Sequence, residues 1–170
     1  MEKQEGVIAE EYPLREAGEK DIPELARLRR LMHEEIRLAR GLPLNPEAVA
    51  AMEEAYGPFA RARLADGTMK AWVIEAQGQI VACGALLILV YPPNPIDPSG
   101  RTARLYSMYT RPEHRRKGLA RRIALKAIEY CKAQGIKRMN LGASPMGRPL
   151  YESLGFEPTS EMRLTFSEGR

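Results

Sequence analysis

The chain contains few of the residues that form disulfides or bind metals. It has two cysteines and two histidines among 170 residues. Cys83 and Cys131 each lie within an apolar pattern, so we expect two reduced thiols in the core of a cytoplasmic protein rather than a disulfide. His33 and His114 are distant in sequence from each other and from the cysteines, so no metal-ligand spacing is present and we expect no metal.

The sequence also lacks a long hydrophobic run. The longest apolar stretch, residues 80–91, is interrupted by Gly84 and stopped by two prolines. A helix that spans a bilayer needs about 20 apolar residues, so we expect no membrane segment. Residues 1–13 have no apolar core of the kind found in secretory signals, which also favours a cytoplasmic location.

The composition that remains is typical of one globular domain. Hydrophobic residues make up 44% and charged residues 28% of the chain, which is enough apolar material to fill a core. These values exclude a disordered tail, a collagen-like repeat and a coiled coil. A length of 170 residues suits a single domain, which we place at residues 12–170 after an N-terminal tail of residues 1–11.

Basic residues are concentrated in the second part of the chain. Residues 1–60 contain 8 Lys or Arg and 13 Asp or Glu, whereas residues 61–170 contain 18 and 9. Within residues 101–126 there are nine basic side chains and one acidic one, Glu113. Such a segment is either a solvated helix face or a docking site for a nucleic acid, a membrane surface or a small phosphorylated molecule.

Hydrophobic periodicity predicts an alternation of strands and helices. The clearest helix has one apolar row, Leu119, Ile123, Ala127 and Cys131, and ends at Gly135. The predicted strands are residues 12–17, 70–76, 79–91, 102–110, 137–141, 156–158 and 162–166, and the predicted helices are residues 22–39, 45–64, 116–134 and 146–154. This order indicates a mixed α/β fold, with a largely antiparallel sheet of about six to seven strands flanked by about four helices.

One segment has the features of an anion site. In residues 109–120 a strand ends at Pro112, a tight basic turn follows, and a helix begins at once. The first amides of a helix have no intrahelical acceptor, and the helix dipole adds positive charge there. Gly118 lets the backbone approach a ligand closely, so the turn is suited to a pyrophosphate. The phosphate-binding patterns G-x-G-x-x-G and G-x-x-x-x-G-K-[ST] are both missing from the sequence.

Two motifs identify a family resemblance. Arg115-x-x-Gly118-x-Ala120 resembles the [QR]-x-x-G-x-[GA] signature of the GNAT superfamily of acyl-CoA N-acyltransferases. Residues 150–156, with the sequence Leu-Tyr-Glu-Ser-Leu-Gly-Phe, resemble the family's L-Y-x-x-x-G-F signature on the next helix. The predicted order of elements is also similar to the GNAT fold, from about residue 12 to residue 166.

The resemblance implies where acetyl-CoA binds. The strand that ends at residue 110 would offer backbone groups to the pantetheine arm, as in sheet pairing, and the amides of the turn would hold the pyrophosphate. In the family the thioester lies where this strand splays from the strand near residues 140–142. Ser144 is at the position where many members have an asparagine that contacts the pantetheine arm. Because serine replaces asparagine here, whether Ser144 makes this contact is left open. The residues expected at acetyl-CoA are Met108, Tyr109, Thr110, Arg115, Arg116, Lys117, Gly118, Leu119, Ala120, Arg121 and Ser144.

Tyr151 matches the tyrosine that donates a proton to the leaving thiolate in many members of the family. A phenol has a pKa of about 10 and is therefore protonated at neutral pH. The alternative role for Tyr151 is that of a core aromatic on an amphipathic helix. The role of Arg148 is also left open. It could contact acetyl-CoA or an acidic group of the substrate, or it could lie on the surface.

The general base is left open by the sequence. Some family members use a glutamate on the central strand, but residues 104–110 contain no carboxylate. Glu34 and Glu35 on the first long helix, Glu75 in the hairpin, and a chain of water molecules are the alternatives. We do not expect His33, His114 or Cys83 to act in the chemistry.

The activity implied by the resemblance is acetyl transfer from acetyl-CoA to a primary amine of a small molecule or peptide, by direct attack in a ternary complex. Two other functions are weighed against it: a non-catalytic acyl-CoA-binding regulator on the same fold, and a nucleic-acid-binding module that uses the basic segment. No recognisable nucleic-acid-binding motif supports the latter, so no nucleic-acid partner is expected. The resemblance leaves a homodimer open.

Overall fold

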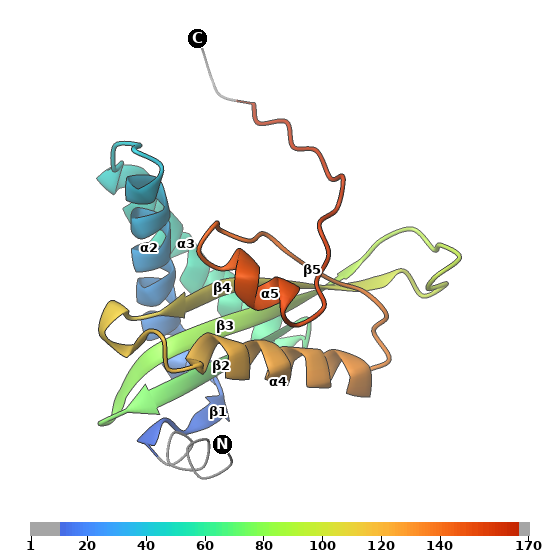
Figure 1. Ribbon diagram of the computed structural model, residues 1–170, viewed down its shortest axis with the longest axis horizontal. Helices are drawn as coiled ribbons and strands as arrows, with labels where there is room; N and C mark the ends of the chain where they lie inside the picture. Colours follow the sequence, from blue (N-terminus) through green and yellow to red (C-terminus); the bar gives the residue numbers. More distant parts are fainter. Residues whose placement is uncertain (1–10, 167–170) are drawn as a thin grey trace.

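Five strands form one sheet, in the order β1-β2-β3-β4-β5 (Figure 1). The computed structural model describes residues 11–166. The strands are β1 (Leu14–Glu16), β2 (Met69–Ala76), β3 (Gln79–Val90), β4 (Arg101–Thr110) and β5 (Met139–Leu141). The first four pair antiparallel and β5 runs parallel to β4. The mixed α/β class and the largely antiparallel sheet are thus confirmed.

Helices cover both faces of the sheet. The chain forms α2 (Ile22–Ala39), α3 (Pro46–Ala65), α4 (Leu119–Ala133) and α5 (Arg148–Glu152), with short 3-10 turns at Glu19–Asp21 and Pro112–His114. Figure 1 shows α4 and α5 on one face and α2 and α3 on the other. Successive side chains of a strand point to opposite faces: Ala71 and Val73 pack in the core with α2 and α3, whereas Trp72 and Ile74 pack with α4.

The predicted helices are confirmed, with local differences at their ends. Asn45 caps α3, because its side chain accepts a hydrogen bond from the Ala48 amide at 3.0 Å. Helix α4 begins at Leu119 rather than at the predicted residue 116, because Arg116 and Gly118 have left-handed φ angles of 65° and 74°. Residues 146–147 stay in a turn, so α5 is shorter than its predicted range.

Helix α4 lies very close to the sheet at Gly84. A Cβ atom at this position would lie 2.6 Å from Ile123 Cγ2 and would also meet the Met108 side chain. Gly84 is therefore the residue that lets α4 pack directly on β3.

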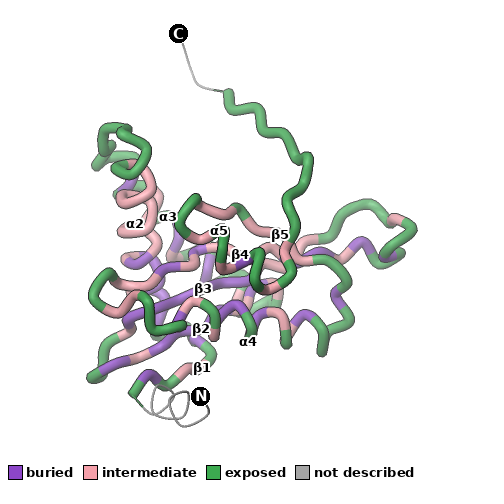
Figure 2. Tube along the Cα trace, viewed as in Figure 1, coloured by how far each residue is buried: buried purple, intermediate pink, exposed green. Residues whose placement is uncertain are grey.

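The last two predicted strands are wrong. Residues 156–158 and 162–166 form no strand, so the sheet has five strands rather than six or seven. The segment runs away from the sheet, and Met162, Leu164 and Phe166 are 94%, 77% and 88% exposed (Figures 1 and 2). Alternation selects residues that could sit in a strand, but a strand also needs a hydrogen-bonded neighbour, which this segment does not have among residues 11–166.

The two cysteines are both free and buried, as predicted. Burial raises the pKa of Cys83 to about 12 and that of Cys131 to about 11, so both are protonated at neutral pH. No helix in the described part of the chain is long and apolar enough to cross a membrane. The predicted N-terminal tail, residues 1–11, lies outside the described residues except for its last position.

An ion-pair cluster joins β1, the start of α2 and β2. The Arg15 guanidinium lies 2.7 Å from Asp21 Oδ2 and 2.5 Å from Glu75 Oε1. Asp21 is 6% exposed and also accepts a hydrogen bond from the Gly18 amide at 2.8 Å. The Arg15 hydrogen bond holds the pKa of Asp21 below its ordinary value.

We therefore predict that Asp21→Asn lowers the free energy of unfolding at neutral pH by roughly 1–3 kcal/mol. A lowered carboxyl pKa stabilises the fold above the ordinary pKa, and this contribution disappears as the pH falls through the lowered value. Urea denaturation at neutral pH and at about pH 2 measures the difference. The gap between wild type and variant should shrink in acid. A gap of equal size at both pH values contradicts the assignment.

Candidate active site

Strand β4 contains one extra residue relative to β3. Ala85 pairs with Tyr106 and Cys83 pairs with Tyr109, so three steps along β4 match two along β3. Ser107 has a left-handed φ of 51°, which marks the β-bulge. Tyr106 packs with the core on the α2 and α3 face, and the adjacent Ser107 accepts a hydrogen bond from Arg29 of α2. The bulge therefore places two successive side chains on the same face of the sheet.

The bulge also reverses which edge of β4 each backbone amide faces. The amide of Ala103 donates to Arg138 on the β5 side, whereas that of Arg111 donates to Val81 on the β3 side. These two residues are separated by an even number of positions, so a regular strand would point both amides to the same edge. After the bulge, the backbones of Met108 and Thr110 consequently face the β5 side.

Strand β5 stops pairing before it reaches these groups. The last β4–β5 pair is Leu105 with Leu141, so β4 continues past the end of the parallel ladder. The Thr110 carbonyl accepts a hydrogen bond from Arg115 Nε at 2.9 Å. The two strands thus separate at the bulge, and the Met108 backbone is left at the point where they part.

The Tyr109 backbone faces the other edge of β4 from that of Met108. Its position opposite Cys83 and the direction of the Arg111 amide turn the Tyr109 backbone toward β3. Its phenol instead donates to Glu35 Oε1 of α2 at 2.5 Å.

The turn after β4 presents a row of backbone donors. Within residues 11–166, the amides of residues 116–121 have no backbone acceptor, and the first helical bond of α4 runs from the Arg122 amide to the Gly118 carbonyl. The positive φ angles at Arg116 and Gly118 curl the chain so that successive amides gather. A Cβ at Gly118 would meet nothing within 4 Å, so glycine is needed there for its backbone angle rather than for space.

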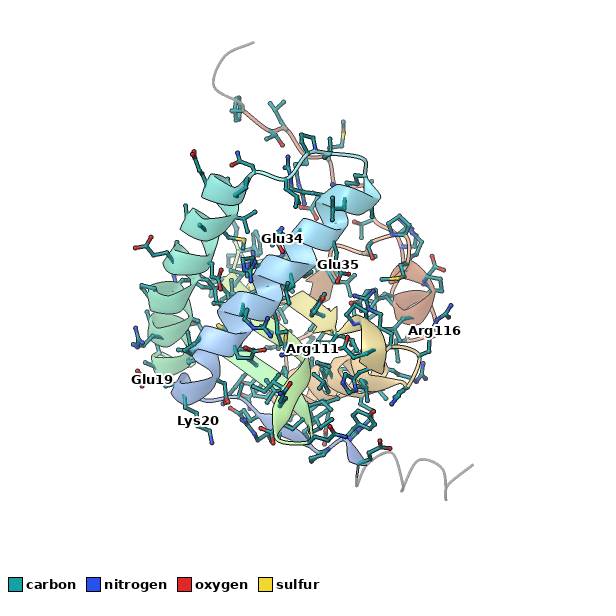
Figure 3. All side chains as sticks on the ribbon, turned by 90° about the vertical axis from the view of Figure 1, so that its left-hand side faces the viewer. Glu19, Lys20, Glu34, Glu35, Arg111 and Arg116 are labelled. Atoms are coloured by element: carbon teal, nitrogen blue, oxygen red, sulfur yellow. The ribbon has the colours of Figure 1, made fainter. Side chains whose placement is uncertain are left out.

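The basic side chains of the turn point in several directions. Arg115 turns inward and lies 2.6 Å from Glu35 Oε2. Lys117 contacts the Tyr12 hydroxyl and ring, and Arg121 donates to Ser153 Oγ at 2.9 Å. Arg116 is exposed at the rim of the turn (Figure 3). The side chain of Leu119 is buried, while Ala120 is half-buried beside it in the first turn of α4.

Ser144 and Tyr151 lie next to each other across the start of α5. Ser144 Oγ accepts the Gly147 amide at 3.1 Å, and the Ser144 carbonyl accepts the amides of Gly147 and Arg148. Ser144 thus fixes the loop that carries α5. Tyr151 is buried and packs edge-on against Phe156. Burial raises the pKa of Tyr151 to about 12, so its phenol holds its proton at neutral pH.

Tyr151 also lines an open cavity of about 720 Å³ beside β5. Its walls come from α4, β5 and the segment that follows α5. Arg148 lies at its edge, half-exposed, with Glu152 as a distant ion partner at 3.9 Å.

The three candidate carboxylates lie in different surroundings. Glu75 is bound to Arg15 at the β1 side of the sheet. Glu34 pairs with Arg30 at 3.0 Å, on the side of α2 nearer α3 (Figure 3). Glu35 faces the turn after β4 and holds both Tyr109 and Arg115 (Figure 3). Of the three, Glu35 is the one that the fold brings to the end of β4.

A family model described as the acetyltransferase (GNAT) family matches residues 28–156. The chain belongs to this family. The match contains the bulge, the turn and α5, so the site described above lies within the family's shared domain. The family is named for acetyl transfer.

Two curated relatives are similar to part of the GNAT domain. Escherichia coli "Uncharacterized N-acetyltransferase YjgM" is 36% identical over 89 residues, which are 51% of this chain and 50% of the relative. Rat "N-acetyltransferase family 8 member 3" is 31% identical over 98 residues, which are 56% of this chain and 41% of the relative. The chain therefore spans half or less of the curated relatives that it matches.

Solved GNAT structures match nearly the whole chain. A GCN5-related N-acetyltransferase from Ralstonia eutropha JMP134 has a TM-score of 0.81 at 28% identity, covering 91% of this chain and 98% of its own. A predicted acetyltransferase from Clostridium acetobutylicum, solved with acetyl-CoA, has a TM-score of 0.81 at 26% identity and covers 91% and 96%.

Sequence reasoning missed the groups on the α2 side of the bulge. Arg29 Nη1 donates to Ser107 Oγ at 2.7 Å, and neither residue was a candidate. The sequence contains one signal, because Ser107 is a polar residue within the predicted central strand. In the structure it is buried. The partner on α2 could not be found without the three-dimensional fold.

The Glu35–Tyr109 contact predicts a measurable shift. Burial raises the pKa of Tyr109 to about 12, and the hydrogen bond to Glu35 adds to this effect. Glu35→Gln should therefore lower the pKa of Tyr109, as read from the tyrosine ring carbon signals in an NMR titration. Glu34→Gln is the matched control and should leave the Tyr109 pKa unchanged. An equal Tyr109 pKa in all three proteins contradicts the contact.

Proposed function

We propose that the protein transfers an acetyl group from acetyl-CoA to a primary amine by direct attack in a ternary complex. The observation that carries this proposal is the β-bulge at Ser107, which turns the Met108 backbone toward the place where β4 and β5 separate, without a strand partner among residues 11–166. An extended pantetheine arm can complete this edge as a further strand would. The amides of residues 116–121, which have no backbone acceptor in the described part of the chain, lie at the end of the same strand, where they would hold the pyrophosphate.

The transfer requires that one bond forms as another breaks. The neutral amine attacks the thioester carbonyl carbon, the C–S bond breaks, and the electron pair leaves with the sulfur. Positioning of the two reactants and polarisation of the carbonyl by nearby donors would supply most of the rate. This chain contributes the backbone of Met108 to that alignment.

Three proton transfers complete the reaction. An alkyl ammonium has a pKa of about 10.4 and must lose a proton before it attacks. We assign this proton to Glu35, directly or through a water molecule, because Glu35 is the candidate carboxylate that lies at the end of β4. Tyr151 gives its phenolic proton to the leaving thiolate. Its burial supports this role, because the raised pKa keeps the donor protonated at neutral pH. The nitrogen loses a second proton as the amide forms, and this proton returns through water to the Tyr151 phenolate.

Replacing the proton donor should slow the chemical step. We predict that Tyr151→Phe lowers kcat for thiol release by about 100-fold, at the low end of the usual effect of a general acid, while the Kd for acetyl-CoA stays the same. Tyr130→Phe is the control, since Tyr130 packs against Trp72 away from α5. Unchanged turnover in Tyr151→Phe removes Tyr151 from the reaction. Acetyl-CoA binding by the wild type without transfer to any amine would instead indicate a non-catalytic acyl-CoA-binding regulator.

Acetyl-CoA binding should be sensitive to replacement of Gly118 in the turn after β4. A branched residue at a φ of 74° is strained by about 1–3 kcal/mol, so Gly118→Val should relax the turn and scatter its amides. We predict that the Kd for acetyl-CoA, measured by calorimetry, rises about tenfold or more. Gly135→Val is the matched control. Gly135 has a similar φ of 66° but follows the C-terminal end of α4, away from the turn. Equal loss of affinity in both variants contradicts the proposed role of the turn.

A further inference from the structure

Arg29 of α2 lacks the carboxylate partner that its neighbours Arg27 and Arg30 have. Arg27 pairs with Glu24 at 3.0 Å, and Arg30 pairs with Glu34 and Glu53 at 3.0 and 2.9 Å. Arg29 lies between them and is half-buried, yet it forms no ion pair with any carboxylate in residues 11–166.

The Arg29 side chain is held in place by uncharged groups. Its guanidinium carbon lies 5.5 Å from the ring centre of Tyr56 and 5.7 Å from that of Tyr106. One guanidinium nitrogen donates to Ser107 Oγ at 2.7 Å. The two aromatic rings fix the guanidinium while leaving most of its N–H donors unused.

Further polar atoms without partners surround this guanidinium. His33 follows Arg29 by one helical turn on α2, and its Nε2 atom is buried without a hydrogen-bond partner among the described residues. The hydroxyl of Tyr56, which is 5% exposed, is likewise unpaired there. Buried polar groups in native proteins are almost always hydrogen-bonded. Arg29, His33 and Tyr56 therefore leave hydrogen-bonding capacity unused on the α2 side of the bulge, and for Arg29 the missing partner is an acceptor.

We propose that the acceptor amine carries a carboxylate close to its amino group, as in an α-amino acid, and that Arg29 and Ser107 bind this carboxylate. This inference rests on the acetyl transfer proposed above. A half-buried guanidinium is stabilised by an anion, and its planar donors match the two oxygens of a carboxylate.

The position of Arg29 limits the length of the acceptor. Arg29 hydrogen-bonds the bulge residue itself, and the unpaired Met108 backbone follows directly in sequence. A carboxylate on Arg29 therefore lies beside the place proposed for the thioester, so few bonds can separate the carboxylate from the attacking nitrogen. Glu35, proposed to receive the amine proton, lies on the same helix and faces the end of β4. The positive and negative side chains of α2 thus match the two ends of a short amino acid.

Matched pairs of acceptors test this proposal. Thiol release from acetyl-CoA is measured with leucine against isopentylamine and with phenylalanine against phenethylamine, each pair differing only by the carboxylate. We expect the wild type to favour the amino acids by about 100-fold or more in kcat/KM, because an acceptor without the carboxylate leaves the guanidinium unpaired. Polyamines and a phosphorylated amine such as phosphoethanolamine complete the panel and should also react poorly.

Removal of the guanidinium should abolish the preference. Arg29→Met keeps an unbranched side chain without the guanidinium and should raise KM for the amino acids until each pair reacts alike, while the plain amines keep their kcat/KM. Arg29→Lys should recover part of the preference. Arg27→Met is the control, because Arg27 lies on the same helix and pairs with Glu24.

Two results would overturn the proposal that the acceptor is an amine with a neighbouring carboxylate. One is a wild type that acetylates plain amines, polyamines or phosphoethanolamine as well as it acetylates amino acids. The other is an Arg29→Met variant that slows both members of each pair equally, which is the result of a merely structural role. The absence of thiol release with every amine contradicts the proposed acetyl transfer itself, and with it the acceptor class.

Discussion

The extra residue in β4 is the feature on which the rest of the site depends. Without the bulge at Ser107, the amides of Ala103 and Arg111 would face the same edge, and the Met108 backbone would face β3. With it, backbone groups that have no strand partner among residues 11–166 face the place where β5 ends, and Tyr106 and Ser107 share the face covered by α2. One inserted residue thus opens an edge of β4 beside the end of β5 and turns a serine toward the opposite helix layer.

Helix α2 then connects the parts of the site. Glu24 pairs with Arg111, and Glu35 holds Tyr109 and Arg115. These contacts fix the end of β4 and the start of the turn that follows it. The turn can therefore keep its position although the amides of residues 116–121 have no backbone acceptor within residues 11–166. A ligand that binds those amides meets a site that is already formed.

Much of this arrangement could be predicted from the sequence, because local patterns specify it. The apolar row of α4, the cap at Asn45 and the glycine at residue 118 each act within a few residues of themselves. Contacts between distant segments could not be predicted. The position of Glu35 at the end of β4 follows from how α2 crosses β4, and the contact of Arg29 depends on the bulge. The missing strands at residues 156–166 have the same cause, since alternation does not supply a pairing partner.

The most direct test of the account is to observe the backbone amides while acetyl-CoA is added. Titration of isotope-labelled protein, followed by amide NMR signals, reports each N–H group separately. The account predicts saturable shifts concentrated at Met108, Thr110 and residues 116–121, with small changes in β1 and β2. Shifts that do not saturate, or that gather on another surface while these amides stay unchanged, would contradict it.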